Sequence, residues 1–240
     1  MKLYLTSNPC AQERTALNPA NGLIDSLRGD LARPASALFV ASDPADHART
    51  EGYSKVMFYC FVQEGFTFAN WRTLDGQNAA EAPELVRGAD FIILAGGHVP
   101  TQNRFFHEIG LKALLEGHPG VVMGVSAGTM NSAETVYAQP ELPGEAVDPD
   151  YRRFLPGLGL TRRNVLPHYQ AVKDDVLDGL RVFEDVSYPD SVGRVFYALP
   201  DGSYIYASGG VEELRGEGWR LADGRMTRVC GDGERLILRD

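Results

Sequence analysis

Short apolar runs alternate with longer amphipathic segments through the first half of the chain. Glycine, proline or small polar residues flank the apolar runs, which is typical of buried strands, and the intervening segments have helical periodicity. The predicted strands are Leu3–Thr6, Ala37–Ala41, Phe66–Trp71, Phe91–Leu94 and Val121–Val125. The predicted helices are Leu23–Leu31, Tyr53–Glu64, Ala80–Arg87 and Thr101–Leu115. This alternation predicts an α/β fold with a mostly parallel central sheet and helices on both faces.

The last third of the chain has a different pattern. Short apolar or β-branched runs are separated there by three Asp-Gly pairs, Asp201-Gly202, Asp223-Gly224 and Asp232-Gly233. Asp-Gly between two strands favours a tight turn. We therefore expect C-terminal β-hairpins that complete or extend the sheet. Residues Gln139–Pro156 are rich in proline, glycine and acids, and they predict a long surface loop.

Composition limits the classes of protein and partner. The 240 residues show no repeat, low-complexity tract or long linker, so we expect a single α/β domain over residues 1–240. The formal net charge of −9 argues against nucleic acid or an anionic membrane as a partner. No apolar run is long enough for a membrane span or a signal peptide. Cys10, Cys60 and Cys230 are few and far apart, which favours a reducing compartment, and we expect a cytoplasmic protein.

One apolar run leads directly into a candidate nucleophile. The strand ends in Gly124-Val125-Ser126-Ala127-Gly128, and a helical pattern follows. A serine at a sharp strand-to-helix turn presents its hydroxyl above the sheet edge, while flanking glycines make room for the tight backbone. Small residues also gather at such junctions by chance, but the strand before Ser126 and the helix after it favour a nucleophile. The N–H groups of Ala127, at a helix N-terminus, and of Gly97, at another strand end, are candidate oxyanion donors.

A serine nucleophile needs a base. The chain has five histidines, at His47, His98, His107, His118 and His168. His168 ends the apolar run "NVLPH" at a further predicted strand end, and it is the best candidate by position. His98 follows Gly96 and Gly97 near the same edge, so we predict that Gly96 and His98 contact the substrate.

Two carboxylates compete to orient the imidazole. Glu141 lies between Ser126 and His168 in the predicted loop, whereas Asp201 follows His168 in "LPDGSY". Asp-Gly is also a preferred hairpin turn and needs no catalytic role, so the pattern leaves both acids open. No paired Cys or His spacing suggests zinc, and the chemistry requires no metal or organic cofactor.

Four motifs occur in an order that resembles a known family. They are "FIILAGGHVPTQNRFF", "GVSAGTMNSAE", "VLPHYQ" and "ALPDGSYIYASGG", and they extend over most of the chain. Together they resemble the peptidase E (aspartyl dipeptidase) family, which includes the cyanophycinases. The resemblance implies a fold similar to class I glutamine amidotransferases, with serine in place of the nucleophilic cysteine, and cleavage of short peptides.

The resemblance also implies roles for individual residues. It places the nucleophile on Ser126, the base on His168 and the third triad member on Asp201, with Glu141 as an alternative acid. The oxyanion donors would be the N–H groups of Gly97 and Ala127. The sequence departs from the family after the catalytic histidine, where "YQAVKDDVLDGL" is acidic and the arginine that binds an N-terminal aspartate is not evident.

The leading hypothesis is a serine exopeptidase that hydrolyses dipeptides or short peptides through an acyl-enzyme on Ser126. The expected partner is a small peptide substrate, with a homodimer as a possible assembly. The predicted loop Gln139–Pro156 would restrict access to small substrates. One alternative is an esterase-like acyl hydrolase that uses Glu141 as its acid, because such enzymes place the acid between serine and histidine. The other is a non-catalytic relative that binds a small ligand.

Overall fold

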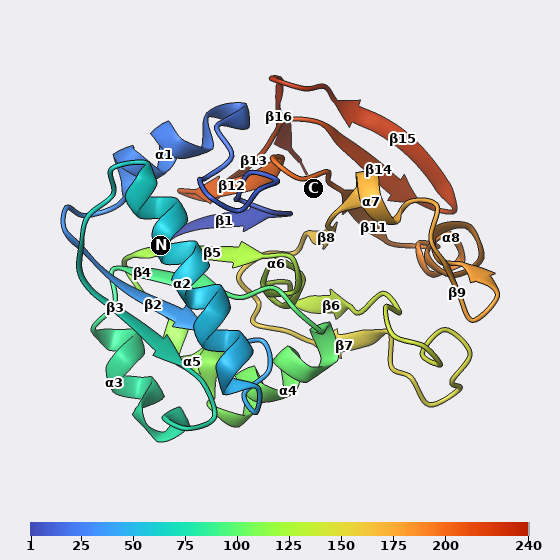
Figure 1. Cartoon of the computed structure of the whole chain (residues 1–240). Coiled ribbons are helices and arrows are strands. Elements are labelled where there is room, and N and C mark those ends of the chain that lie inside the picture. The colour runs from blue at the N-terminus through green and yellow to red at the C-terminus, as the bar shows by residue number, and fades with distance from the viewer. Residues whose placement is uncertain (240) are drawn as a thin grey trace.

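An eight-stranded sheet runs through the computed structural model, which describes residues 1–239 (Figure 1). Five neighbouring strands are parallel: β1 (Lys2–Thr6), β5 (Val121–Val125), β4 (Phe91–Leu94), β2 (Ala35–Val40) and β3 (Phe68–Leu74). Antiparallel strands continue the sheet beyond β1: β12 (Tyr204–Ser208), β13 (Val211–Arg215) and β16 (Arg235–Leu238). The parallel half is therefore built by the first half of the chain, as its pattern predicts.

Helices cover both faces of the sheet, because successive side chains of the parallel strands point to opposite sides. Ala37 and Phe39 pack with residues of α1 (Leu23–Asp30) and α2 (His47–Gln63). Leu38 and Val40 face the other way, into a cluster with residues of three helices, α3 (Ala82–Arg87), α4 (Val99–Glu108) and α5 (Leu111–Leu115). Figure 1 shows α2 in front of the sheet and α3 to α5 below it. The predicted α/β fold class is confirmed.

Some element boundaries differ from the predictions. Helix α2 begins at His47, before the predicted start at Tyr53, because the Asp46 side chain caps it by accepting a hydrogen bond from the Arg49 N–H at 3.1 Å. The single helix predicted over 101–115 is divided into α4 and α5, and the break lies at Gly110, whose φ is +64°. Strand β3 begins and ends later than the predicted Phe66–Trp71.

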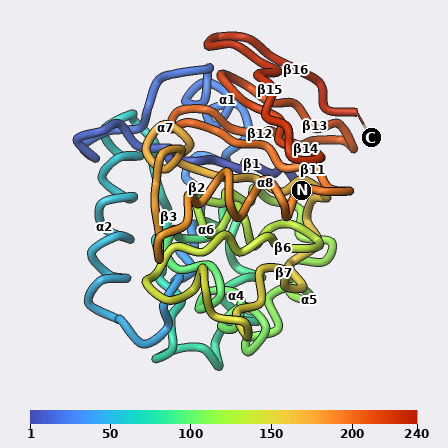
Figure 2. Tube along the Cα trace, turned by 90° about the vertical axis from the view of Figure 1, so that its right-hand side faces the viewer, coloured from blue at the N-terminus to red at the C-terminus, as the bar shows by residue number. Residues whose placement is uncertain are grey.

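A second sheet has four strands in the order β15 (Arg225–Cys230), β14 (Gly218–Ala222), β11 (Val195–Ala198) and β8 (Asn164–Leu166). The hairpin predicted at Asp201-Gly202 is wrong: β11 pairs in parallel with β8, and the chain then crosses to the central sheet as β12. Asp232-Gly233 likewise connects strands of different sheets, whereas Asp223-Gly224 joins the antiparallel pair β14 and β15 as predicted. In Figure 2 orange β12 lies beside blue β1.

The remaining elements are short, and two pairs of them, β6 with β7 and β9 with β10, form two-stranded sheets. They are η1 (Ala20–Gly22), η2 (Ala79–Glu81), α6 (Ala127–Asn131), β6 (Thr135–Tyr137), β7 (Phe154–Pro156), α7 (Tyr169–Val172), β9 (Val176–Leu177), β10 (Leu180–Arg181), the π-helical turn η3 (Val182–Ser187) and α8 (Tyr188–Asp190). The predicted loop Gln139–Pro156 thus ends in a strand, β7, which pairs with β6. No helix within residues 1–239 combines the length and apolar character needed to cross a membrane.

Both sheets contribute to one buried cluster. Leu5 and Ile92 of the central sheet share it with Val165, Tyr197 and Cys230 of the second sheet. Because the two sheets bury apolar surface against common neighbours, we propose that residues 1–240 form one domain.

Candidate active site

The carboxyl ends of the parallel strands meet at one edge of the central sheet. Thr6 of β1 lies opposite Val125 of β5, and β4 ends beside β5 in the same direction. In parallel sheets, ligand sites lie beyond this edge. The residues that follow these strand ends are Ser7, Gly96, Gly97 and Ser126.

Ser126 occupies a tight turn between β5 and α6. Its φ is 49° and its ψ is −110°, a backbone conformation that residues other than glycine rarely adopt. Helix α6 begins at the next residue. The two flanking glycines allow this turn. A Cβ on Gly128 would collide with the Leu94 backbone, and one on Gly124 would collide with the backbone at Thr129. The spacing of Gly124, Ser126 and Gly128 therefore reflects the close packing of α6 against β4 and β5.

The second sheet supplies a histidine and a carboxylate to the same place. Strands β8 and β11 are parallel, with Leu166 opposite Ala198, and His168 and Asp201 follow their ends. The Ser126 Oγ lies 2.9 Å from His168 Nε2. His168 Nδ1 lies 2.7 Å from Asp201 Oδ1. Hydroxyl, imidazole and carboxylate thus form the line of hydrogen bonds that serine hydrolases use.

Ser7 connects these groups to β1, and the sequence analysis missed it. Its hydroxyl donates a hydrogen bond to Asp201 Oδ1 at 2.7 Å and accepts one from the His168 N–H at 2.7 Å. The Asp201 N–H in turn donates to Gln170 Oε1 at 3.0 Å. The one available signal was the position of Ser7, a polar residue directly after the first predicted parallel strand.

Two opposing effects act on the pKa of Asp201. Burial raises it, because a carboxylate loses hydration, while hydrogen bonds from His168 and Ser7 together with the charge of His168 lower it. The lowering effects win, and the pKa of Asp201 lies below its ordinary value. Asp201 is therefore ionised at neutral pH and can stabilise a positive charge on the imidazole.

The alternative acid, Glu141, lies elsewhere on the site. Its Oε1 accepts a hydrogen bond from the Val99 N–H at 3.1 Å, and within residues 1–239 the carboxyl partner of His168 Nδ1 is Asp201 instead. Loss of hydration raises the pKa of Glu141, an effect only partly offset by the Val99 N–H and by the charges of His98 and His168.

Both ring nitrogens of His98 are engaged within the protein. Nδ1 lies 2.7 Å from Thr101 Oγ1, and Nε2 lies 2.8 Å from Glu145 Oε1. This arrangement fastens the 139–153 loop, which lies between β6 and β7, to the start of α4. The predicted substrate contact of His98 stays a prediction. Gly96 packs against Ser126, since a Cβ on Gly96 would lie 3.3 Å from the Ser126 Cβ. Its predicted substrate contact stays a prediction.

A cavity of about 340 Å³ opens beside Ser126 and His168. Its walls are mostly apolar, and the loop contributes Gln139, Pro140 and Glu141. The other lining residues are Gly97, Val99, Met130, Pro167, Val172, Asp175, Val176, Leu177 and Val182. Two carboxylates and no lysine or arginine are among the lining residues within the described part of the chain. The cavity therefore combines apolar and polar walls, with an acidic bias.

Gly97 lines the cavity together with Ser126, and Ala127 follows Ser126 in the chain, so their N–H groups stay the predicted oxyanion donors. Within residues 1–239, neither donates a hydrogen bond to another protein group, whereas the next N–H, of Gly128, bonds Ala95 O at 3.1 Å. Gly97 has a φ of +154°, and a Cβ there would run into the Ser42 side chain. Glycine is required at this position for both reasons, and the resulting backbone leaves its N–H unbonded.

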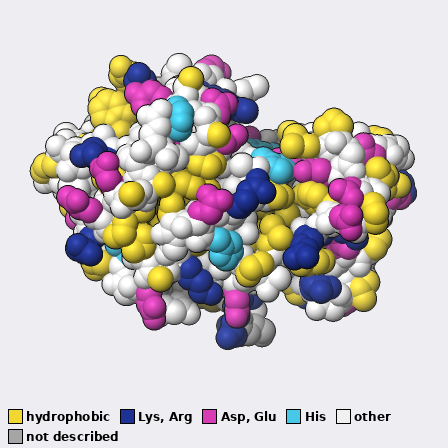
Figure 3. Space-filling model, turned by 90° about the horizontal axis from the view of Figure 1, so that it is seen from below, with side chains coloured by type: hydrophobic (Ala, Val, Ile, Leu, Met, Phe, Trp, Pro, Cys, Tyr) yellow, Lys and Arg dark blue, Asp and Glu magenta, His cyan; other side chains and the backbone are white. Residues whose placement is uncertain are grey.

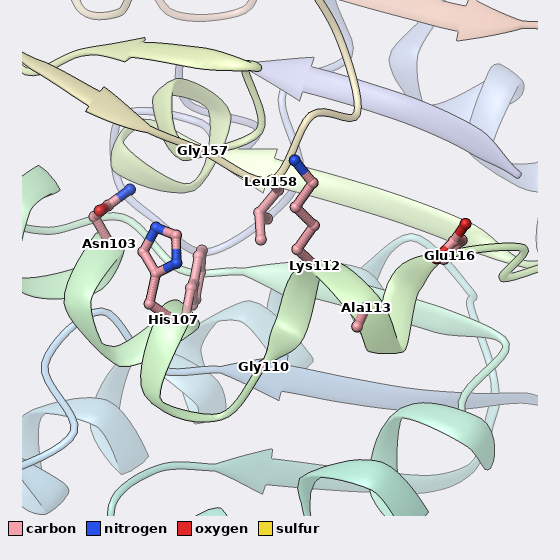
Figure 4. Close-up of a pocket in the computed structure, with 9 residues that line it drawn as sticks. Asn103, His107, Gly110, Lys112, Ala113, Glu116, Gly157 and Leu158 are labelled. Atoms are coloured by element: carbon pink, nitrogen blue, oxygen red, sulfur yellow. The ribbon is translucent and has the colours of Figure 1, made fainter.

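A second hollow, of about 330 Å³, lies between α4, α5 and the chain just after β7 (Figure 4). The His107 ring and the Asn103 amide on its wall each bond Pro156 O at 2.9 Å, so both hold the end of β7.

Acidic and basic side chains are interspersed with apolar ones on the face seen from below (Figure 3). Within residues 1–239, no three His, Cys, Asp or Glu residues gather as metal ligands.

The model of peptidase family S51 matches residues 3–214. The chain belongs to peptidase family S51. The match confirms the resemblance drawn from the sequence motifs, and it makes the protein a serine hydrolase of the peptidase class. No curated protein matches the chain.

Two solved structures share the fold of this S51 chain. A peptidase from an acI-B1 Actinobacterium is 16% identical, with a TM-score of 0.64, and the alignment covers 99% of this chain and 96% of the other. A putative peptidase E protein from Listeria monocytogenes EGD-e is 15% identical, with a TM-score of 0.59 and coverage of 95% and 98%. At these identities the likeness concerns the fold.

Proposed function

We propose that this S51 peptidase hydrolyses dipeptides or short peptides through an acyl-enzyme on Ser126. The observation that carries the proposal is the continuous hydrogen-bonded line from Ser126 Oγ through His168 to Asp201, with both contacts below 3 Å. Ser126 itself lies on a strained turn beside a cavity, where a nucleophile can reach a substrate.

In the first half of the reaction, Ser126 Oγ attacks the scissile carbonyl carbon while His168 Nε2 takes the hydroxyl proton. The N–H groups of Gly97 and Ala127 stabilise the oxyanion of the tetrahedral intermediate. As the intermediate collapses, the C–N bond breaks and His168 delivers its proton to the leaving amine. Asp201 accepts the Nδ1–H throughout and holds the ring in the tautomer that leaves Nε2 free to accept.

In the second half, a water molecule attacks the ester carbon of the acyl-enzyme. His168 removes a proton from that water and returns it to Ser126 Oγ as the ester bond breaks, which releases the carboxylic acid. Every proton is moved by His168, so the proposed steps use no metal or organic cofactor.

The size of the cavity supports short substrates. A volume of about 340 Å³ is at the lower end of the roughly 300–1,000 Å³ found for small-molecule sites. The 139–153 loop forms one wall through Gln139, Pro140 and Glu141. A folded protein chain would have to displace this loop, whereas a dipeptide can enter beside it.

Ser126→Ala tests the proposal. Against a panel of dipeptides, we expect kcat to fall by about 10⁴- to 10⁶-fold, because the variant keeps the oxyanion donors but lacks the nucleophile. Ser132→Ala is a matched control, since the Ser132 hydroxyl, just after α6, donates a hydrogen bond to Gly128 O and within residues 1–239 bonds no group of the proposed triad. Undiminished dipeptide turnover by Ser126→Ala would refute the mechanism.

Two further measurements address the rival functions. Turnover of ester substrates in preference to peptides would support an esterase. Failure of a serine-directed phosphonate to label Ser126 in the folded protein would support a non-catalytic relative.

We also propose a cytoplasmic location, a proposal supported by three cysteines that are free and buried.

A further inference from the structure

The cavity beside Ser126 is lined by a carboxylate, Glu141, that the proposed catalytic steps do not use. Glu141 lines this cavity together with Ser126 and His168. The charge of His168 lowers the pKa of Glu141 and so partly offsets the effect of its lost hydration. The second lining acid is Asp175 of the 173–175 segment, and both Glu141 and Asp175 are exposed residues. The apolar side chains around them include Val99, Met130 and Leu177.

We propose that Glu141 binds the free α-ammonium group of the substrate's N-terminal residue, and that the apolar walls accept an uncharged side chain of that residue. This specificity rests on the proposed acyl-enzyme at Ser126. The substrates it selects are peptides that begin with an unblocked apolar residue such as leucine or methionine.

Covalent geometry brings an ammonium group close to any scissile bond next to an N-terminal residue. Standard bond lengths place the α-nitrogen about 2.5 Å from the carbonyl carbon of the same residue. When that carbon lies at Ser126 Oγ, the ammonium must therefore occupy the same cavity. Glu141 is the one carboxylate that lines the cavity from the loop side, so it is positioned to pair with this charge.

The Glu141 carboxylate has capacity for such a partner. Its Oε1 accepts one hydrogen bond, from the Val99 N–H, while an ionised carboxylate can accept about four. Partial loss of hydration raises the pKa of Glu141. A carboxylate that has lost part of its water gains more from a cationic partner than a fully hydrated one does. An arriving ammonium would therefore stabilise the ionised form.

The same charges disfavour an acidic N-terminal residue. A substrate side chain that carries a carboxylate would face Glu141 and Asp175, and within residues 1–239 no lysine or arginine lines the cavity to neutralise it. Burial of an unpaired charge against apolar walls is costly. A leucyl or methionyl side chain would instead bury apolar surface against Val99, Met130 and Leu177.

A pair of substrates that differ only in the amino group tests the role of Glu141. Leucyl-alanine and its desamino analogue, 4-methylpentanoyl-alanine, both release alanine, and kcat/KM is measured for each. Glu141→Gln keeps an oxygen that can accept from the Val99 N–H. For leucyl-alanine we expect this variant to lose about 10- to 100-fold in kcat/KM, the usual range for a hydrogen bond to a charged group. For the desamino analogue we expect a change below about threefold.

Asp148→Asn is the matched control, because Asp148 lies on the same loop but is not among the cavity-lining residues within residues 1–239, and its Oδ1 accepts a local hydrogen bond from the Asp150 N–H. We expect it to keep the preference for leucyl-alanine over the desamino analogue. Equal losses on both substrates in Glu141→Gln, or no loss on either, would overturn the proposal.

A series of Xaa-alanine dipeptides tests the side-chain preference. Leucyl- and methionyl-alanine should exceed aspartyl-alanine by at least about tenfold in kcat/KM, and a preference for aspartyl-alanine would overturn the proposal. Ser126→Ala is run beside each substrate. If it stays active, the proposed function has failed; if it is inactive while the substrate ratios are unaffected by Glu141→Gln, only the specificity has failed.

Discussion

The hydroxyl of Ser7 donates a hydrogen bond to Asp201 Oδ1 at 2.7 Å, and this contact joins the two sheets at the site. Ser7 follows a strand of the central sheet, which also carries Ser126, whereas Asp201 follows a strand of the second sheet. The same hydroxyl accepts the His168 N–H. The geometry between nucleophile and base therefore depends on how the two sheets dock, and Ser7 is a positioning residue at that junction.

Ser7→Ala should lower kcat while leaving KM nearly unchanged. The variant loses one bond that orients Asp201 and one that holds the His168 backbone. We expect kcat to fall by about 10-fold and the free energy of unfolding by about 1–2 kcal/mol, because the N–H of the half-buried His168 is left unpaired. Steady-state kinetics and urea denaturation measure the two effects.

Ser26→Ala serves as the control for Ser7→Ala. It removes a hydroxyl that bonds Tyr4 and Arg215, away from the site. It should lose stability without losing kcat. If Ser7→Ala also kept full kcat, Ser7 would not position the catalytic groups.

Asp201→Asn should reduce kcat by about 10⁴-fold, as loss of a triad carboxylate does when the geometry is kept. The amide can donate to His168 Nδ1 and so favours the tautomer that cannot accept the Ser126 proton. The measurement is kcat on 4-methylpentanoyl-alanine, with Glu141→Gln for comparison, because this substrate lacks the ammonium group assigned to Glu141. A larger loss in Glu141→Gln than in Asp201→Asn would transfer the acid role to Glu141.

Gly97→Ala should impair oxyanion stabilisation. The new Cβ would meet the Ser42 side chain, and relief of that collision must move the Gly97 N–H. Misplacing one oxyanion donor costs about 10²- to 10³-fold in kcat. Ser42→Gly added to Gly97→Ala removes the colliding side chain and should restore part of kcat, measured at saturating substrate. Full activity of the single variant would exclude Gly97 as a donor.

Asp30 should make stability dependent on acid pH. Burial raises the pKa of Asp30, but hydrogen bonds from Lys2, Tyr4 and Tyr206 outweigh it, so the pKa lies below the ordinary value of 3.8. The resulting stabilisation is fully present above that ordinary value, and it is lost as the pH falls through the lower pKa of the folded state. The reason is that the unfolded chain binds more protons in this window.

Urea denaturation at several pH values below about 5 would measure this dependence. The free energy of unfolding should fall with decreasing pH more steeply in the wild type than in Asp30→Asn, by at most about 1.4 kcal/mol per pH unit for one proton. Asp25→Asn is the control, because the Asp25 side chain is 86% exposed. Identical slopes for wild type and Asp30→Asn would contradict the prediction.

Local patterns predicted the parallel half of the fold well. Phe91–Leu94 and Val121–Val125 are strands with the expected bounds, because a short apolar run between glycine-rich or polar turns has few other ways to bury itself. The start of α2 was missed because its cap is the polar Asp46 side chain, which the apolar periodicity does not include.

The Asp-Gly pairs show where local patterns mislead. Asp223-Gly224 joins paired strands as expected, but Asp201-Gly202 lies where the chain leaves one sheet for the other. The turn preference of the dipeptide is the same in both places, and the partner that each flanking strand finds elsewhere in the chain makes the difference.

By itself, the sequence determined the strand-to-helix junction at Ser126 and selected His168 as the base, because both depend on residues that are neighbours in the chain. The tertiary structure showed that Asp201, the acid that the resemblance implied, lies at the imidazole rather than Glu141. It alone decided that Ser7 connects these groups, and that two acids but no arginine or lysine within residues 1–239 line the cavity. These features join residues up to 194 positions apart. Their geometry follows from how the two sheets dock, which no local preference encodes.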